Sequence, residues 1–126
     1  MKQILLAAAF ALGFSQEASA NVNRLFCVGT EPFYAIDIHV SSGMMKLTTP
    51  EDLNGTTYEI EGPINAQGIQ DNVVMVFKGR YSDITLNVIS EHVAGKCHDG
   101  MSDEEYPYHL VYMHGDSVKY GCCKRN

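Results

Sequence analysis

The sequence has few basic residues. It carries 9 Lys and Arg against 15 Asp and Glu, with a formal net charge of −6 and a pI near 5.2. Its longest basic run is Lys124-Arg125. Proteins that bind nucleic acids need clustered Lys and Arg to neutralise phosphates. This composition therefore argues against a nucleic acid as the main partner.

Motifs of common enzyme classes are also missing. The chain has no Gly-x-Ser-x-Gly nucleophile elbow, no His-Glu-x-x-His zinc motif and no glycine-rich phosphate loop. Glu59 and Glu61 fall on one face of an expected strand, where two solvated carboxylates are commoner than a glycosidase pair. We therefore favour a protein that is not an enzyme, and we predict no cofactor.

Long apolar runs are missing after residue 20. Before it, Met1-Lys2 is followed by an apolar run at residues 4–14 and by Ala18-Ser19-Ala20, which together are typical of a Sec-type signal peptide. Ser15-Gln16-Glu17 ends the run well short of the roughly 20 residues that a membrane span needs. We expect a signal-peptide helix in residues 1–20, cleavage after Ala20, and a single exported domain at residues 21–126. That domain should have no transmembrane segment and be periplasmic or secreted.

The rest of the chain alternates apolar and polar residues in short stretches, as half-buried strands do. The expected strands are residues 33–40, 44–49, 56–61, 73–78, 83–89, 108–113 and 117–122. Residues 21–25 indicate a polar lead-in, and Gly62-Pro63 is expected to end a strand. No stretch shows a convincing helical period. The pattern predicts an all-β fold, a small antiparallel barrel or sandwich of about 7–8 strands.

All four cysteines lie in the expected mature chain, and exported cysteines tend to form disulfides. A bridge between the adjacent Cys122 and Cys123 would strain the backbone. Two pairings then remain open, Cys27–Cys122 with Cys97–Cys123 or Cys27–Cys123 with Cys97–Cys122. If residues 122 and 123 are extended, their side chains point to opposite faces of the strand. Two bridges could therefore leave the last strand in opposite directions and staple the fold.

The loop after Cys97 holds the densest acidic run, with two histidines close by. Its ionisable side chains include His98, Asp99, Asp103, Glu104, Glu105 and His109. Carboxylates and imidazoles are metal ligands, so the alternative function is a metal-binding envelope protein. Its ligands would be His98, Asp99, Asp103 and His109. The plainer interpretation is a solvated turn in which Asp99 bonds to the backbone beside Gly100.

Two further features could extend this loop into a binding surface. Tyr106, Tyr108, Tyr112 and Tyr120 crowd the C-terminal region, and tyrosines suit either a binding rim or the edge of a small core. Glu31 could accept backbone hydrogen bonds from residues 99–103, so that both segments form one clasp.

Two motifs together resemble a family of small bacterial envelope proteins and lipoproteins, some linked to META-type β domains. Residues 27–34, CVGTEPFY, carry a Gly-x-Glu-Pro-Phe-aromatic pattern, and residues 97–108, CHDGMSDEEYPY, precede Gly121-Cys122. The chain departs from the family at Tyr34, where Trp is usual, and has no lipobox before Cys27. The resemblance implies an exported β domain with a Cys97–Cys122 bridge, favours Cys27–Cys123 as the second bridge, and implies no activity.

These observations predict an exported, non-enzymatic binding or inhibitor module. The expected partner is a basic envelope protein such as a cell-wall hydrolase, because the surface around residues 98–109 is acidic and rich in tyrosine. The expected contact residues are Glu31, Asp99, Asp103, Glu104, Tyr106 and Tyr108.

Overall fold

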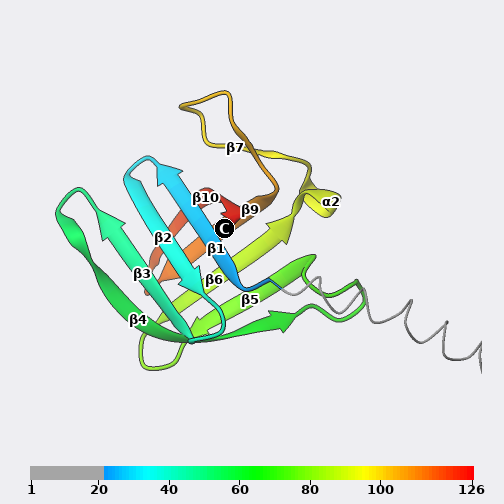
Figure 1. Cartoon of the computed structure of the whole chain (residues 1–126), viewed down its shortest axis with the longest axis horizontal. Coiled ribbons are helices and arrows are strands. Elements are labelled where there is room, and N and C mark those ends of the chain that lie inside the picture. Colours follow the sequence, from blue (N-terminus) through cyan, green and yellow to red (C-terminus); the bar gives the residue numbers. More distant parts are fainter. Residues whose placement is uncertain (1–21) are drawn as a thin grey trace, which may run out of the picture.

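The computed structural model describes residues 22–126, so the expected signal peptide and its cleavage site lie outside the described residues. The described chain forms a closed barrel of eight antiparallel strands (Figure 1). These strands are β1 (Arg24–Thr30), β2 (Phe33–His39), β3 (Met44–Thr49), β4 (Asp52–Asn65), β5 (Val74–Gly79), β6 (Ile84–Ser90), β9 (Tyr108–His114) and β10 (Ser117–Arg125). The all-β prediction is confirmed, and closure makes the fold a barrel rather than a sandwich.

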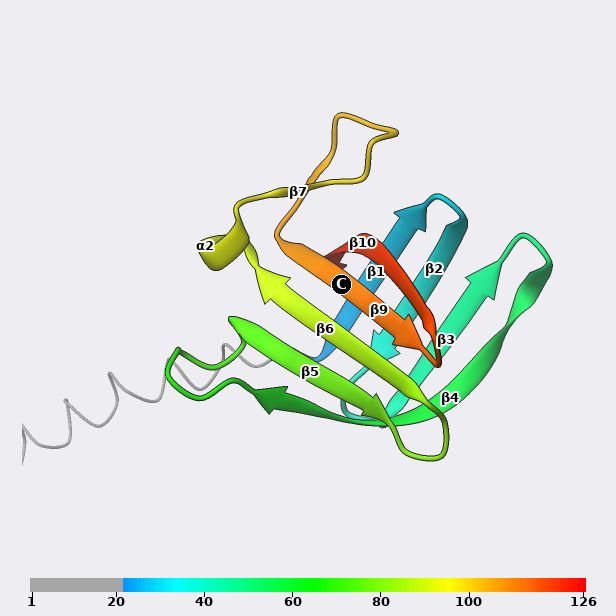
Figure 2. The same ribbon diagram turned by 180° about the vertical axis from the view of Figure 1, so that it is seen from behind.

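Most strands of the barrel pair with the next strand in the chain. The exception is β6, which pairs with β9 because an excursion interrupts the meander. The excursion contains α2 (Glu91–Ala94), β7 (Cys97–His98) and β8 (Glu105–Tyr106), and it stands off one end of the barrel (Figures 1 and 2). Pairing of β1 with β10 closes the barrel. Within residues 22–126, the structure contains no helix with the length and apolarity that a membrane crossing requires.

Period-2 alternation explains the core. In β2 the inward positions hold Tyr34, Ile36 and Ile38, all at most 1% exposed, while Asp37 faces outward and pairs with Arg24 at 2.7 Å. Each of the other strands also contributes inward apolar or aromatic side chains. An eight-stranded barrel is just wide enough for side chains to fill its interior. Large residues such as Phe77 and Met75 are fully buried there, so the interior is a packed core.

Several strand boundaries differ from the sequence predictions, since β4 begins at Asp52 rather than at residue 56 and β10 runs to Arg125 rather than to residue 122. The polar lead-in expected at residues 21–25 is wrong from Arg24 onward, because β1 begins there and is held by pairing with both β2 and β10. The expected break at Gly62-Pro63 is also wrong, since β4 continues to Asn65. The register against β5 shifts between Glu61 and Ile64. Such a bulge lets a strand tolerate a proline that cannot donate to the ladder.

The two disulfides leave β10 on opposite faces. Cys27–Cys123 joins β1 to β10 and lies in the main core, whereas Cys97–Cys122 ties β7 to the outside of β10. Cys97 and Cys122 form a second small buried cluster with Tyr106. Consecutive residues of an extended strand point to opposite faces. The adjacent Cys122 and Cys123 therefore link β10 to the excursion on one face and to β1 on the other. This is the pairing that the family resemblance implies.

Candidate functional site

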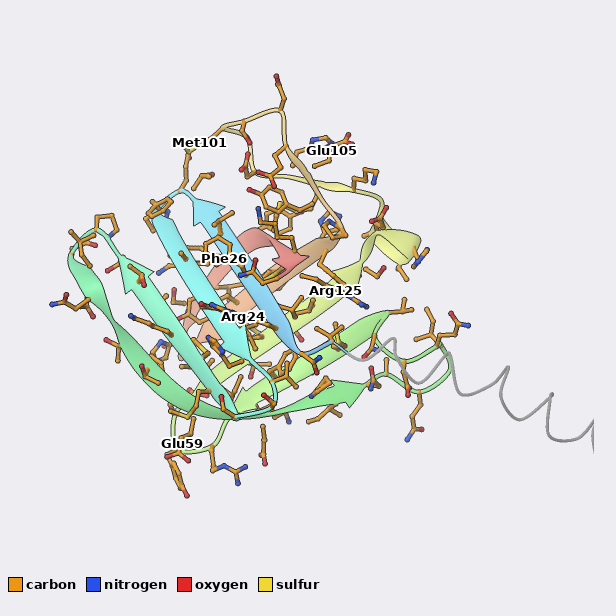
Figure 3. All side chains as sticks on the ribbon, in the orientation of Figure 1. Arg24, Phe26, Glu59, Met101, Glu105 and Arg125 are labelled. Carbon is orange, nitrogen blue, oxygen red and sulfur yellow. A yellow bond between two sulfur atoms is a disulfide. The ribbon has the colours of Figure 1, made fainter. Side chains whose placement is uncertain are left out.

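The acidic loop predicted from the sequence forms a projecting hairpin. We call residues 97–106 the acidic hairpin; it consists of β7, a tip at residues 99–104, and β8. Figure 3 shows Met101 and Glu105 on this segment, away from the barrel wall. Met101 is 74% exposed, and Asp103, Glu104 and Glu105 are also exposed. The hairpin therefore presents carboxylates around an exposed apolar side chain.

Asp99 organises the tip from inside. Its Oδ1 accepts hydrogen bonds from the backbone N–H groups of Met101 at 2.9 Å and Ser102 at 3.1 Å. The Tyr106 hydroxyl donates to Oδ2 at 3.1 Å. The two backbone bonds are the main reason that the pKa of Asp99 lies below its usual value. The structure thus has the side-chain-to-backbone turn of the plainer interpretation, and the carboxylate of Asp99 stabilises the loop.

Three contacts anchor the hairpin to the barrel. The Cys97–Cys122 disulfide holds its first strand. The Thr30 hydroxyl donates to the backbone carbonyl of Asp99 at 3.1 Å. Lys124 Nζ lies 3.1 Å from a carboxylate oxygen of Glu104. The last contact joins two partly exposed side chains, and such pairs contribute little, so the disulfide and Thr30 are the main anchors.

The expected clasp exists, but a different residue makes it. Thr30, not its neighbour Glu31, reaches the hairpin. Within the described residues, the Glu31 carboxylate has no hydrogen-bond or ion-pair partner, and it is exposed in the β1–β2 turn. Glu31 therefore remains available beside the hairpin. Nothing local in the sequence marks Thr30, because its partner Asp99 lies 69 residues away.

The two histidines of the predicted metal site point to other partners. His98 Nε2 lies 3.8 Å from Glu105, whereas His109 Nε2 lies 2.9 Å from the Gly95 carbonyl. Because a carbonyl only accepts hydrogen bonds, the proton of the His109 ring lies on Nε2. In that tautomer Nδ1 is the acceptor, and the Tyr120 hydroxyl donates to it. In residues 22–126, no group of three or more His, Cys, Asp or Glu is placed to hold a metal ion. The four predicted ligands, His98, Asp99, Asp103 and His109, are not brought together.

The two tyrosines assigned to the binding surface are almost entirely buried. Tyr106 is 6% exposed and packs in the cluster under the hairpin, where burial, followed by its bond to Asp99, raises its pKa to about 12. Tyr108 is 5% exposed and its hydroxyl accepts a hydrogen bond from Arg125 Nε at 3.0 Å. Tyr106 thus packs beneath the hairpin and Tyr108 in the barrel core, so neither ring is available as a surface contact. Of the expected contact residues, Glu31, Asp103 and Glu104 are the exposed ones.

The hollows of the described surface are shallow and mostly lie elsewhere. One of about 270 Å³ lies beside Val22, Pro63 and Asn72, and another of about 360 Å³ lies beside Tyr58 and Tyr81. The gap between hairpin and barrel is only about 30 Å³, which is little more than the volume of one water molecule. The candidate site is therefore the projecting surface itself.

No family model, curated protein or solved structure matches this chain, so the family resemblance stays a prediction and the candidate site is defined by its geometry.

Proposed function

We propose that this protein is an exported, non-enzymatic binding module whose acidic hairpin recognises a basic envelope protein of the cell-wall hydrolase class. The observation that carries the proposal is the fixed shape of the tip. Asp99 holds the backbone of the tip, and the Cys97–Cys122 bridge and Thr30 hold its base. A loop that is already ordered loses less conformational entropy on binding.

Electrostatics favour a basic partner. The chain has a net charge of −6, and the tip adds exposed carboxylates at Asp103 and Glu104, with Glu31 nearby. Complementary charge raises association rates and selects against acidic partners. The expected Sec-type leader supports export, and two disulfides are typical of an oxidising compartment.

The direct test measures binding to a purified, basic lysozyme by calorimetry, together with inhibition of cell-wall lysis. We expect binding to weaken as salt rises, because added ions screen exposed charges within roughly 8–10 Å at 0.10–0.15 M. Charge reversal in Asp103→Lys should weaken binding by roughly tenfold or more, which is about 1.4 kcal/mol.

The matched control is Asp71→Lys, which reverses another exposed carboxylate, in the β4–β5 loop away from the hairpin. Both variants change the net charge by the same amount. The proposal fails if the lysozyme does not bind at low salt, or if the two variants lose the same affinity.

A further inference from the structure

The outer face of β6, β9 and β10 carries no charged side chain over its central part. We call the six outward residues there the uncharged wall. They are Thr85, Asn87, Val111, Met113, Val118 and Tyr120. When the inner face of an antiparallel sheet packs a core, its outer face is normally polar. Three of these strand positions hold Val or Met instead, although the barrel already has a filled core.

The wall is continuous across the three strands. Met113 lies opposite Val118, and Val111 lies opposite both Tyr120 and Asn87. Asn87 Nδ2 donates to the Val111 carbonyl at 3.1 Å and lies 3.7 Å from Met113 Sδ. Residues directly opposite on neighbouring strands lie side by side. These side chains therefore form one patch rather than scattered exposed apolar residues.

The patch is open to solvent. Val118 is 62% exposed, Tyr120 55% and Met113 38%. Figure 2 shows the outside of β6 and β9 with no other segment of the described chain across it. Single exposed apolar residues are ordinary, but a contiguous exposed patch on a small protein marks an interaction surface.

The wall joins the acidic hairpin at Tyr120. The Tyr120 hydroxyl lies 3.4 Å from Cys97 Sγ at the base of the hairpin. The opposite end of the wall is also acidic. Asp83 and Asp116 are exposed there, and a 2.9 Å bond from the Gly115 N–H to the Asp83 carbonyl holds their two turns together.

Neighbouring cations offset only part of this acidic rim, and one of them, the exposed Lys78 on β5, lies opposite Thr85 at the edge of the wall. Lys124 pairs with Glu104 and neutralises that one carboxylate, whereas Asp103 beside it is exposed. Lys119 points inward, with Nζ 6.0 Å from the ring centroids of Tyr34 and Tyr112. The wall is therefore an uncharged strip, half of it Val and Met, with exposed carboxylates at both ends and Lys78 at its β5 edge.

We propose that the uncharged wall and the acidic hairpin form one interface for a basic protein that presents an apolar patch ringed by Lys and Arg. This inference rests on the proposed function and specifies the surface of its partner. Protein interfaces commonly combine an apolar centre with a polar rim. The wall supplies the centre, and the hairpin carboxylates with Asp83 and Asp116 supply the rim.

The acidic rim also selects against a second copy of this chain. In a two-fold pairing that aligns two walls lengthwise, each end of one wall meets an end of the other. Both ends are acidic, so carboxylates would face carboxylates, which is unfavourable at an interface. A partner with basic groups around its apolar patch meets no such repulsion.

The test uses the same lysozyme and the near-isosteric double variant Met113→Gln/Val118→Thr, which leaves the net charge unchanged. We expect at least about a tenfold loss of affinity, as for apolar positions near an interface centre, with an unchanged salt dependence. Asp103→Lys should instead change the salt dependence.

The control is Leu53→Gln on β4. Leu53 is an apolar residue that is 77% exposed and lies off the wall, so this variant should bind like wild type. Urea unfolding of each variant checks that the fold is intact.

The outcomes separate this inference from the proposed function. If wild type does not bind the lysozyme, the proposed function fails and the wall loses its partner. If Asp103→Lys weakens binding but the wall variant binds like wild type, only the wall is overturned. Amide NMR shifts give a second readout, because Val111, Met113 and Val118 should respond to the lysozyme and silence there overturns the inference. A concentration-dependent dimer that the wall variant abolishes would assign the wall to a second copy, and would also overturn it.

Discussion

At the scale of single residues, two glycines make room for one buried tyrosine. A Cβ at Gly29 would lie 2.0 Å from the Tyr34 ring, and one at Gly121 would lie 2.6 Å from its hydroxyl. The ring therefore fills space that β1 and β10 leave empty. Within the described residues its hydroxyl is buried and has no hydrogen-bond partner, and burial raises its pKa to about 12. A polar group buried without a partner costs free energy.

We predict that Tyr34→Phe stabilises the barrel, by on the order of 1 kcal/mol, because it removes an unsatisfied buried hydroxyl and keeps the ring. The matched comparison is Tyr112→Phe, which removes a hydroxyl that lies 3.2 Å from His114 Nδ1. That variant should lose about 0.5–1.5 kcal/mol, the usual net value of a hydrogen bond. Urea unfolding measures both. Equal losses in the two variants would contradict the prediction.

Asp99 predicts a pH-dependent hairpin. Its pKa is lowered by the backbone bonds from Met101 and Ser102, so the ionised form favours the folded tip. The stabilisation of the tip by ionised Asp99 is complete at pH values above the ordinary aspartate pKa of about 4. It is lost as the pH falls through the lowered pKa of Asp99. The amide NMR signals of Met101 and Ser102 should move together in that acidic range. In Asp99→Asn the same signals should not titrate there, and a titration that persists would point to another group.

At the scale of elements, the hairpin depends on a disulfide that the barrel does not need for closure. Cys97 and Cys122 are 25 residues apart, and closing such a loop contributes about 3–4 kcal/mol in the chain-entropy model. We predict that Cys97→Ala/Cys122→Ala retains the barrel, as seen by protected β9 and β10 amides in hydrogen exchange. The amides of residues 97–106 should lose protection. If the whole chain unfolds instead, the excursion is part of the barrel's folding unit.

Sequence patterns predicted the elements with regular alternation and missed those that tertiary contacts impose. β2 and β6 alternate cleanly and were expected at nearly their observed positions. β1 was missed because Arg24, Gly29 and Thr30 give a weak strand signal, and pairing on both edges makes it a strand. The hairpin was expected as a loop, but burial of Tyr106 follows from contacts with Cys122 and Asp99 that no local pattern encodes. The uncharged wall could not be predicted, because recognising it requires knowing that β6, β9 and β10 are neighbours, and the sequence does not determine the order of the strands.

At the scale of the whole molecule, one seam closes the barrel. β1 and β10 come from opposite ends of the described chain, and their pairing completes the ring. Cys27–Cys123 crosses this seam inside the core and links residues 96 positions apart. Contacts at such separation form at a high cost in loop entropy. The bridge therefore acts on the stability of the entire fold, while Cys97–Cys122 acts on the shape of the surface.

This division of roles predicts opposite profiles for two disulfide variants. Cys27→Ala/Cys123→Ala should lose about 4–5 kcal/mol from loop entropy alone, a large share of the roughly 5–15 kcal/mol that stabilises a domain. It also leaves a space in the core, because Cys27 and Cys123 are fully buried. Its thermal midpoint should therefore fall further than that of Cys97→Ala/Cys122→Ala.

Binding should show the opposite order when it is measured well below both thermal midpoints. The Cys27→Ala/Cys123→Ala variant should bind the lysozyme probe like wild type, since its hairpin and wall are intact. The hairpin variant should bind more weakly despite its greater stability. If affinity follows stability in both variants, the hairpin has no separate role in binding.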